Sequence, residues 1–419
     1  MNYPLISEYI ESIMSAEDNF DQLSSLRPVL DSYGNPVMSS GNFAVVFKMK
    51  DIDTGKFYAV KCFIKDQEGR NESYAMIADE LKNVSSPYIV PIRFLERELF
   101  VDSSQSDETE FPVLVMDWVE GKTLDAYLTE VFLCLEKIKK EEDFFNCKFY
   151  FRKPEIRGIM NLRKPDNICI SKSGRLVWKY DEEELPNQDG ENMQKIRKEI
   201  EFKRHIYTSF KKKGWYYGIN SFEDYKLAEF YEAYERDIDC RISQQKNEIN
   251  KKYQEQYKYI QLLLFRFCRM AYWILSQPFA HGDLKPDNIL VREDGSLVLV
   301  DYDGFYVPAM KGQEARELGS PDFRHPQRIP QDFDEHIDDF SIATIALSLK
   351  ALSLDWQLYE GKDQLLFSES DYLDLENSLM MKKISKIKDE EVSLFIEIFQ
   401  FVYKNKKINN DYKWKLWIG

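Results

Sequence analysis

The order of hydrophobic and polar residues changes character along the chain. In the first part, hydrophobic residues alternate with polar ones at period two, as they do on strands with one buried face. This pattern predicts two strands within residues 37–63, with Asp53-Thr54-Gly55 as the turn between them, and further strands at residues 88–95 and 111–119. The intervening residues 71–83 have helical spacing, so one helix is predicted within this β-rich part.

Helical patterns flank and interrupt this arrangement. Residues 1–30 predict one or two short amphipathic helices. From about residue 137 to about residue 258, charges are dense and helical periodicity dominates. We interpret this segment as an insertion with solvated helices, because a run of mixed charges normally marks a solvent-facing helix surface. Compact helical folding is expected to resume at Tyr259 and to continue to the C-terminus.

Composition narrows the classes of function. The 419 residues include 57 Lys and Arg against 72 Asp and Glu, a formal net charge of −15, which argues against broad binding to nucleic acid. The N-terminal residues carry acids where a secretory signal is positive, and the apolar stretch 262–275 is too short to span a membrane. The six cysteines are scattered without a CxxC pair. We therefore expect a cytoplasmic protein that binds neither nucleic acid nor membrane.

The strongest chemical signal lies in the run HGDLKPDN at residues 281–288. A short hydrophobic strand, a turn and a second strand follow, and the second strand ends in Asp301. This order predicts that two acids, Asp283 and Asp301, meet the amide of Asn288 and the ammonium group of Lys285. Phosphoryl transfer needs such a set: a base for the attacking hydroxyl, oxygen ligands for Mg²⁺, and a cation for the group in flight.

These residues resemble the catalytic machinery of eukaryotic-like (Hanks-type) serine/threonine protein kinases. HGDLKPDN is similar to the catalytic loop of that family, and Asp301-Tyr302-Asp303-Gly304 is similar to its magnesium-binding DFG motif. The resemblance implies that Asp283 is the catalytic base, that Lys285 supports the phosphate, and that Asn288 and Asp301 hold Mg²⁺. It also implies that Asp338 braces the catalytic loop and that residues 319–327 end an activation segment.

The same resemblance implies an ATP site upstream. Residues 39–46 resemble the glycine-rich loop but keep only its middle glycine, Gly41, and Ala59-Val60-Lys61 resembles the strand whose lysine grips the phosphates. Residues 115–121 resemble the hinge that binds adenine. The implied nucleotide-binding residues, besides Asn288 and Asp301, are Gly41, Val46, Ala59, Lys61, Met116 as gatekeeper, Asp117, Val119 and Leu290.

The sequence departs from the family at two points. The helix that should pair a glutamate with Lys61 has Ile77 at that position, and we expect Glu80, one turn further on, to be the partner. Gly282 replaces the arginine that reads an activation-loop phosphate, and residues 307–319 contain no Ser, Thr or Tyr. Any activity is therefore expected not to depend on phosphorylation of that stretch.

The insertion contains a second copy of part of the catalytic motif. Lys164-Pro165-Asp166-Asn167-Ile168 repeats residues 285–289 at an offset of 285 − 164 = 121. Leu162 and Tyr180 stand where the later copy has its two essential acids, so the first copy cannot perform the chemistry. Two interpretations remain open: a duplicated or mimicking strand–turn–strand hairpin, and a coincidence.

The resemblance implies an α+β fold with two lobes, a small antiparallel β-rich N-lobe and a mainly helical C-lobe. Residues 1–30 would be a helical extension, residues 31–120 the N-lobe, and residues 121–419 the C-lobe with its insertion at about 137–258. The expected function is ATP- and Mg²⁺-dependent phosphorylation of Ser or Thr in a protein substrate, with the insertion as a surface for a protein partner. The alternatives are a nucleotide-binding pseudokinase or scaffold and a small-molecule kinase of the aminoglycoside or choline type.

Overall fold

A computed structural model describes residues 2–41, 43–160, 168–170, 176–178, 222–361 and 365–418. Of these, the residues between 144 and 242 and residues 417–418 are described by their backbone alone. The chain forms two compact units. One unit combines Met1–Phe132 with Tyr257–Gly419, and the other is Leu133–Gln256. The bounds of the second unit differ by only a few residues from those expected for the insertion, about 137–258.

An antiparallel sheet forms the N-terminal part of the first unit. Its strands are β1 (Leu26–Pro28), β2 (Met38–Ser40), β3 (Ala44–Asp51), β4 (Phe57–Phe63), β5 (Ile92–Phe100) and β6 (Glu110–Asp117). They follow the order β1-β3-β4-β6-β5, and β2 pairs with β3. Helix α3 (Arg70–Leu81) connects β4 to β5 and buries Tyr74, Ile77 and Leu81. Strands β3, β4 and β6 lie where the alternation predicted strands, β5 begins four residues later than expected, and β2 was not predicted.

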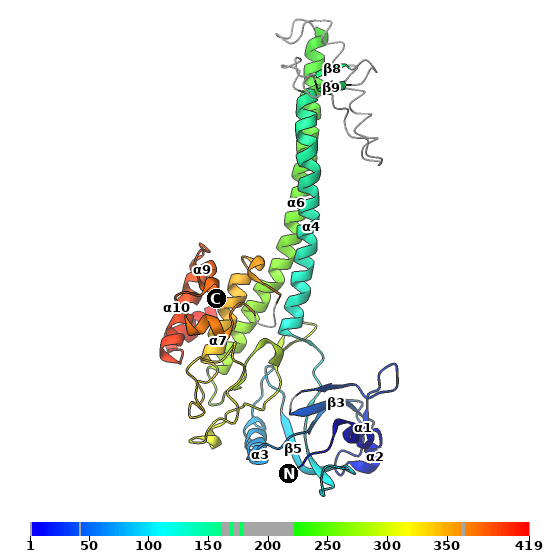
Figure 1. The fold of residues 1–419 in the computed structure, drawn as a ribbon, viewed down its shortest axis with the longest axis vertical. Coiled ribbons are helices and arrows are strands. Elements are labelled where there is room, and N and C mark those ends of the chain that lie inside the picture. Colours follow the sequence, from blue (N-terminus) through cyan, green and yellow to red (C-terminus); the bar gives the residue numbers. More distant parts are fainter. Residues whose placement is uncertain are drawn as a thin grey trace. The chain divides into compact units, whose positions relative to one another are not determined.

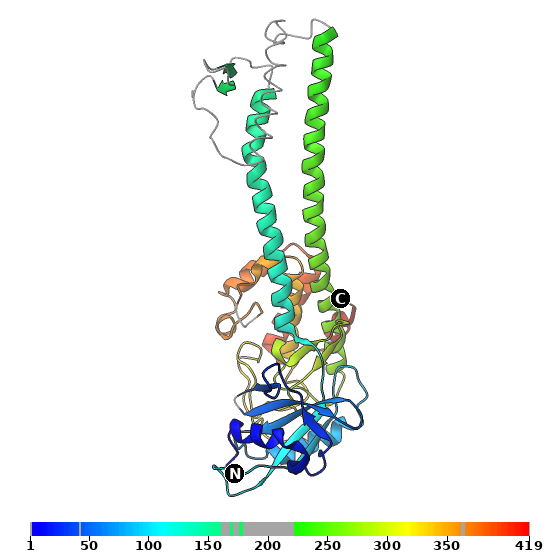
Figure 2. The same ribbon diagram turned by 90° about the vertical axis from the view of Figure 1, so that its right-hand side faces the viewer.

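The N-terminal extension is only partly helical. Helices α1 (Ile6–Met14) and α2 (Ala16–Asn19) lie next to the sheet, and the chain then enters it as β1, which pairs with β3 (Figure 2). The buried hydroxyl of Tyr9 donates a hydrogen bond to the carbonyl of Phe63 at 2.7 Å. The prediction of helices alone for residues 1–30 is corrected, because a three-residue strand is too short to show a period.

The C-terminal part of the first unit is mainly helical. Helix α7 (Asp339–Leu352) is buried along its whole length, as its nearly continuous run of apolar and small residues requires. The other helical elements of this part are η4 (Pro308–Met310), η5 (Trp356–Leu358), α8 (Glu369–Leu373), α9 (Leu379–Ile384), α10 (Glu390–Asn405) and α11 (Asn410–Ile418). Figure 1 shows α9 and α10 beside α7, with α10 packed along it.

A short three-stranded sheet carries the motif residues. The 3₁₀ turn η3 (Pro286–Asn288) leads into β10 (Ile289–Val291), which pairs with β11 (Leu297–Leu299) and with β7 (Lys122–Thr123). In β10, Ile289 and Val291 are buried and Leu290 is half-buried, as period-two alternation requires. The chain around HGDLKPDN is therefore held by a hairpin on its C-terminal side.

The second unit is built on two long helices that continue into the first. They are α4 (Leu124–Met160) and α6 (Phe222–Ile274), and they run side by side in Figure 1. Within this unit, Ile138, Ile249 and Tyr253 pack together. The hydroxyl of Tyr253 donates to Glu142 at 3.0 Å. The unit also holds the hairpin of β8 (Ile168–Ile170) and β9 (Leu176–Trp178).

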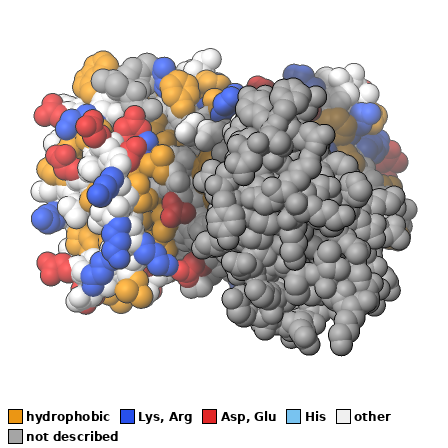
Figure 3. All heavy atoms as spheres, turned by 90° about the horizontal axis from the view of Figure 1, so that it is seen from above, with side chains coloured by type: hydrophobic (Ala, Val, Ile, Leu, Met, Phe, Trp, Pro, Cys, Tyr) orange, Lys and Arg blue, Asp and Glu red, His pale blue; other side chains and the backbone are white. Residues whose placement is uncertain are grey.

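The architecture is therefore α+β, with an antiparallel sheet and a helical part, which is compatible with a two-lobed kinase-like fold. Among the described residues, every helix is too short or too polar to cross a membrane. On the described side of the face in Figure 3, acidic, basic and hydrophobic side chains are interspersed. The net charge of −15 is thus not gathered into one acidic patch on that surface.

Candidate active site

Lys61 and Asp301 meet although 240 residues separate them. Lys61 lies in β4 opposite Val46 of β3 and is only 7% exposed. Its Nζ is 2.8 Å from Oδ1 of Asp301, just after β11, and it also forms an ion pair with Asp303. The upstream lysine therefore points at the late acids.

The charges in this pair stabilise each other. Burial by itself lowers the pKa of Lys61, but Tyr74, Asp301 and Asp303 oppose it and raise that pKa well above its ordinary value. Burial by itself raises the pKa of Asp301, yet Lys61 outweighs it and lowers that pKa. Both groups are consequently charged at neutral pH.

Asp283 is surrounded by donors. Its carboxylate lies 2.9 Å from Nζ of Lys285, accepts a hydrogen bond from the backbone N–H of Ser320 at 2.7 Å, and lies 3.2 Å from Nδ2 of Asn288. Burial raises the pKa of Asp283, but Lys285 and these hydrogen bonds prevail, so the net shift is downward. A base that is ionised and oriented in this way fits the role predicted for it.

Asn288 and Asp301 are oriented as oxygen ligands. The Nδ2 group of Asn288 donates to the backbone carbonyl of Asp283 at 2.8 Å, and its Oδ1 accepts no hydrogen bond from the described residues. Asp301 adopts φ = 65°, which is rare for a residue other than glycine. The described residues contain no cluster of three metal-ligating side chains. Mg²⁺ needs fewer, because it usually takes one or two protein ligands and completes its shell with phosphates and water.

The buried Asp338 binds the backbone at the start of the loop 281–288. The carboxylate of Asp338 accepts hydrogen bonds from the backbone N–H groups of His281 and Gly282, and the His281 ring contacts the carbonyl of Val300 at 2.9 Å. Asp338 is 1% exposed, and burial raises its pKa. The bracing role expected for Asp338 therefore has a direct geometric basis.

Steric contact explains why position 282 is glycine. Gly282 has φ = 82°, and a Cβ built on it would lie 1.9 Å from the carbonyl oxygen of Gly304. An arginine would collide with the segment that carries Asp301. A different arginine approaches instead: Nη1 of Arg328 donates to the Gly282 carbonyl at 2.8 Å. The arginine that would bind an activation-loop phosphate is thus absent at a position where the backbone packs too closely to admit any side chain.

The residues expected around ATP come from β3, β4 and β6 of the large sheet, from the turn before β3, and from β10 of the small sheet. Gly41 forms the turn between β2 and β3, with its N–H bonded to the carbonyl of Ala44 at 2.9 Å. The side chains of Val46 and Leu290 are half-buried, and that of Ala59 is buried. In the predicted hinge, Met116 lies opposite Ala59 in the sheet and Asp117 opposite Tyr58. The N–H of Trp118 donates a hydrogen bond to the carbonyl of Phe57 in the sheet, whereas no described residue accepts one from the N–H of Val119.

The partner expected for Lys61 is not found. Glu80 is half-buried on α3 but makes no ion pair with Lys61 among the described contacts; Asp303 and Asp301 occupy that position. The prediction of Glu80 rested on helical spacing. Such spacing cannot show that an acid from a distant segment pairs with the lysine instead. Sequence reasoning also gave no role to Tyr74, whose hydroxyl donates to Asp303.

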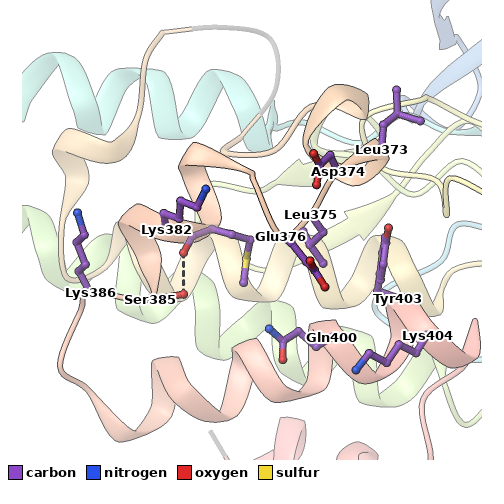
Figure 4. A pocket seen from close by; sticks show the side chains of 11 residues that line it. Leu373, Asp374, Leu375, Glu376, Lys382, Ser385, Lys386, Gln400, Tyr403 and Lys404 are labelled. Carbon is purple, nitrogen blue, oxygen red and sulfur yellow. Dashed lines mark hydrogen bonds between the residues drawn. The ribbon is translucent and has the colours of Figure 1, made fainter.

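A separate cavity lies away from these residues. It has a volume of about 680 Å³ and is bounded by α9, α10 and the loop after α8. Figure 4 shows Lys382, Lys386 and Lys404 around it together with Asp374 and Glu376. Because it contains none of the motif residues, it has no part in the candidate active site.

No family model matches the chain. Two serine/threonine kinases are similar to parts of it. Over 120 residues the chain is 23% identical to probable serine/threonine-protein kinase WNK10 of Arabidopsis thaliana. This match covers 29% of this chain and 22% of that protein. Over 80 residues it is 34% identical to serine/threonine-protein kinase pakB of Dictyostelium discoideum, which covers 18% and 9%. The matches thus span less than a quarter of each relative and support a kinase relationship.

Proposed function

We propose that this chain is a protein kinase that transfers the γ-phosphoryl group of Mg²⁺-bound ATP to Ser or Thr hydroxyls of a protein substrate. The observation that carries the proposal is the 2.8 Å contact between Lys61 and Asp301, with Asp283 and Asn288 on the same loop system. Partial similarity to two serine/threonine kinases supports it. Residues 31–120 would form the N-lobe and residues 121–419 the C-lobe with its insertion.

Each side chain has a role that its contacts suit. Asp283 would accept the proton of the attacking hydroxyl, and Lys285, 2.9 Å away, would neutralise charge on the transferred group. Lys61 would contact the phosphates, while Asn288 and Asp301 would hold Mg²⁺, which neutralises developing charge when bound. Val46, Ala59 and Leu290 would enclose the adenine, with the free N–H of Val119 as a donor to it.

Contacts of Ser320 favour a protein substrate over a small metabolite. Its backbone N–H binds Asp283, and its hydroxyl accepts from Nζ of Lys285 at 3.1 Å. The backbone at Ser320 is thereby fixed beside the base, where a peptide substrate would have to approach. Gln67 of the sheet-side segment also donates to Glu317 at 2.8 Å, so this region is ordered by unmodified side chains.

One assay tests the proposal. The purified chain and the variant Asp283→Asn are incubated with Mg-ATP labelled at the γ-phosphate and with a mixture of protein and small-molecule acceptors. Label on protein that disappears in the variant is the expected result. Nucleotide binding without transfer would instead identify a pseudokinase, and label on metabolites alone would identify a small-molecule kinase.

A further inference from the structure

Helix α3 presents no carboxylate to Lys61. At the position where the resembled family has its glutamate stands Ile77, which is fully buried. Glu72 is exposed and Glu80 is half-buried, and neither has a described contact with the lysine. The link between this helix and the phosphate-binding lysine must therefore run through other groups, or be missing.

Asp303 forms that link together with Tyr74. The Oδ1 atom of Asp303 pairs with Nζ of Lys61 and also accepts a hydrogen bond from the Tyr74 hydroxyl. Tyr74 is 1% exposed, and its ring stacks on Phe94 and packs against Phe63, with centroid distances of 5.7 and 5.6 Å. The hydroxyl is consequently fixed in place by the core of the sheet.

A second carboxylate solves an electrostatic problem at this site. Asp301 is the residue proposed to hold Mg²⁺, and a divalent cation competes with an ammonium group for one carboxylate. Asp303 gives Lys61 a carboxylate of its own, on a side chain that is 17% exposed. Arg316 lies within electrostatic range of Asp303, Tyr74 and Glu317 and so balances part of the negative charge.

We propose that Asp303, fixed by Tyr74, is the positioning residue that holds Lys61 in the active site, in place of a helix glutamate. The inference rests on the proposed function, because it concerns the same lysine. It divides one role between two elements: α3 supplies the rigid hydroxyl, and the segment after Asp301 supplies the charge. The position of α3 is thereby coupled to the segment that carries the metal ligand.

The test compares four single variants of the full chain: Asp303→Asn, Tyr74→Phe, Glu80→Gln and Asp79→Asn. Asp79 is an exposed acid on the same helix and serves as the matched control. Three quantities are measured for each variant: the affinity for Mg-ADP, by titration calorimetry, and kcat and KM for ATP. Thermal unfolding is recorded in parallel.

Loss of the charge in Asp303→Asn is expected to lower kcat/KM by about 10- to 100-fold, with kcat falling more than Mg-ADP affinity. Tyr74→Phe, which keeps the ring, is expected to lower it by about 3- to 10-fold, and Asp79→Asn by less than about twofold. The double variant Ile77→Glu with Asp303→Asn should recover part of the loss, because it returns a carboxylate to the lysine from the helix.

Other results would overturn the proposal. If Glu80→Gln lost activity and Asp303→Asn kept it, the helix glutamate would be the true partner. If wild type bound Mg-ADP and Asp303→Asn behaved like Asp79→Asn, this inference alone would fail. If wild type bound no nucleotide, the proposed function would fail together with it. Should Asp303→Asn not fold, Tyr74→Phe decides, and unchanged kinetics there would contradict the coupling.

Discussion

Two hairpins in this chain have the same pairing and different surroundings. The first consists of β8 and β9 in the insertion, and the second of β10 and β11 beside the candidate active site. Their registers coincide at an offset of 289 − 168 = 121 residues: Ile168↔Trp178, Cys169↔Val177 and Ile170↔Leu176 against Ile289↔Leu299, Leu290↔Val298 and Val291↔Leu297. The repeated sequence thus forms a repeated strand pair, which both a duplication and a coincidence in a hairpin with a glycine turn would give.

The two hairpins differ in the residues that flank them. The second hairpin pairs with β7 and is flanked by Asp283 and Asp301. The first has Leu162 and Tyr180 at those positions, which lie outside the described residues, as does the rest of the repeat before Ile168. Under the proposed function, the hairpin would space the motif residues, and the flanking acids would carry out the chemistry.

The largest effect should come from removing a flanking acid. Asp283→Asn is expected to reduce phosphoryl transfer at least about 10³-fold, because no base then accepts the hydroxyl proton. The matched change in the first copy, Leu162→Asn, should leave the rate within about twofold. Rates are measured with labelled ATP. Equal losses in both variants would contradict the separation of scaffold and site.

Gly282→Ala should be the most destabilising of these substitutions. The new Cβ would meet the Gly304 carbonyl at 1.9 Å in a left-handed backbone conformation, so a loss of about 3 kcal/mol in unfolding free energy is expected. Asn161→Ala, at the corresponding place in the first copy, should change it by less than about 0.5 kcal/mol. Denaturant titration measures both, and a stable Gly282→Ala would refute the close packing.

Asn288 and Asn167 occupy equivalent positions in the two copies. Asn288→Ala is expected to lower kcat about 10- to 100-fold and to raise the Mg²⁺ concentration needed for half-maximal rate, because one oxygen ligand is lost. Asn167→Ala should change neither value by more than about twofold. A magnesium titration of the rate distinguishes them, and an effect of Asn167→Ala would mean that the first copy takes part.

The smallest expected effect concerns pH. The folded-state pKa of Asp283 is lowered, so its ionised form stabilises the protein above the unfolded pKa, and this contribution is lost only as pH falls through the folded value. Because the Asp283 carboxylate stays ionised between pH 6 and 8, its titration should change kcat/KM for ATP by less than about twofold over that range. An acid limb above pH 6 that disappeared on changing Asp283 alone would show that the carboxylate is not held by Lys285.

Much of the fold was predictable because it depends on local patterns. Strands β3, β4 and β6 and helix α3 lie where the hydrophobic pattern predicted them, and the second unit lies where charge density predicted an insertion. Strand β1 was not predicted. It lies in a segment expected to be helical, and it forms because its backbone completes the edge beside β3.

The candidate site was predictable where its residues share one short segment. Asp283, Lys285 and Asn288 lie within six residues, so any backbone that follows the motif brings them together. The partner of Lys61 was not predictable in this way, because Glu80 is near in sequence whereas Asp303 is 242 residues away. The proximity of Ser320 to Asp283 likewise depends on how the activation segment returns to the loop.

The sequence by itself determined which residues can perform chemistry, since the motif fixes their types and their spacing along one strand pair. It also determined that the first copy lacks both acids. Tertiary structure alone decided which carboxylate reaches Lys61 and why residue 282 must be glycine. Both depend on contacts between segments that are distant along the chain, and such distances are set by the packing of the sheet, α3 and the loop after β11 rather than by any local pattern.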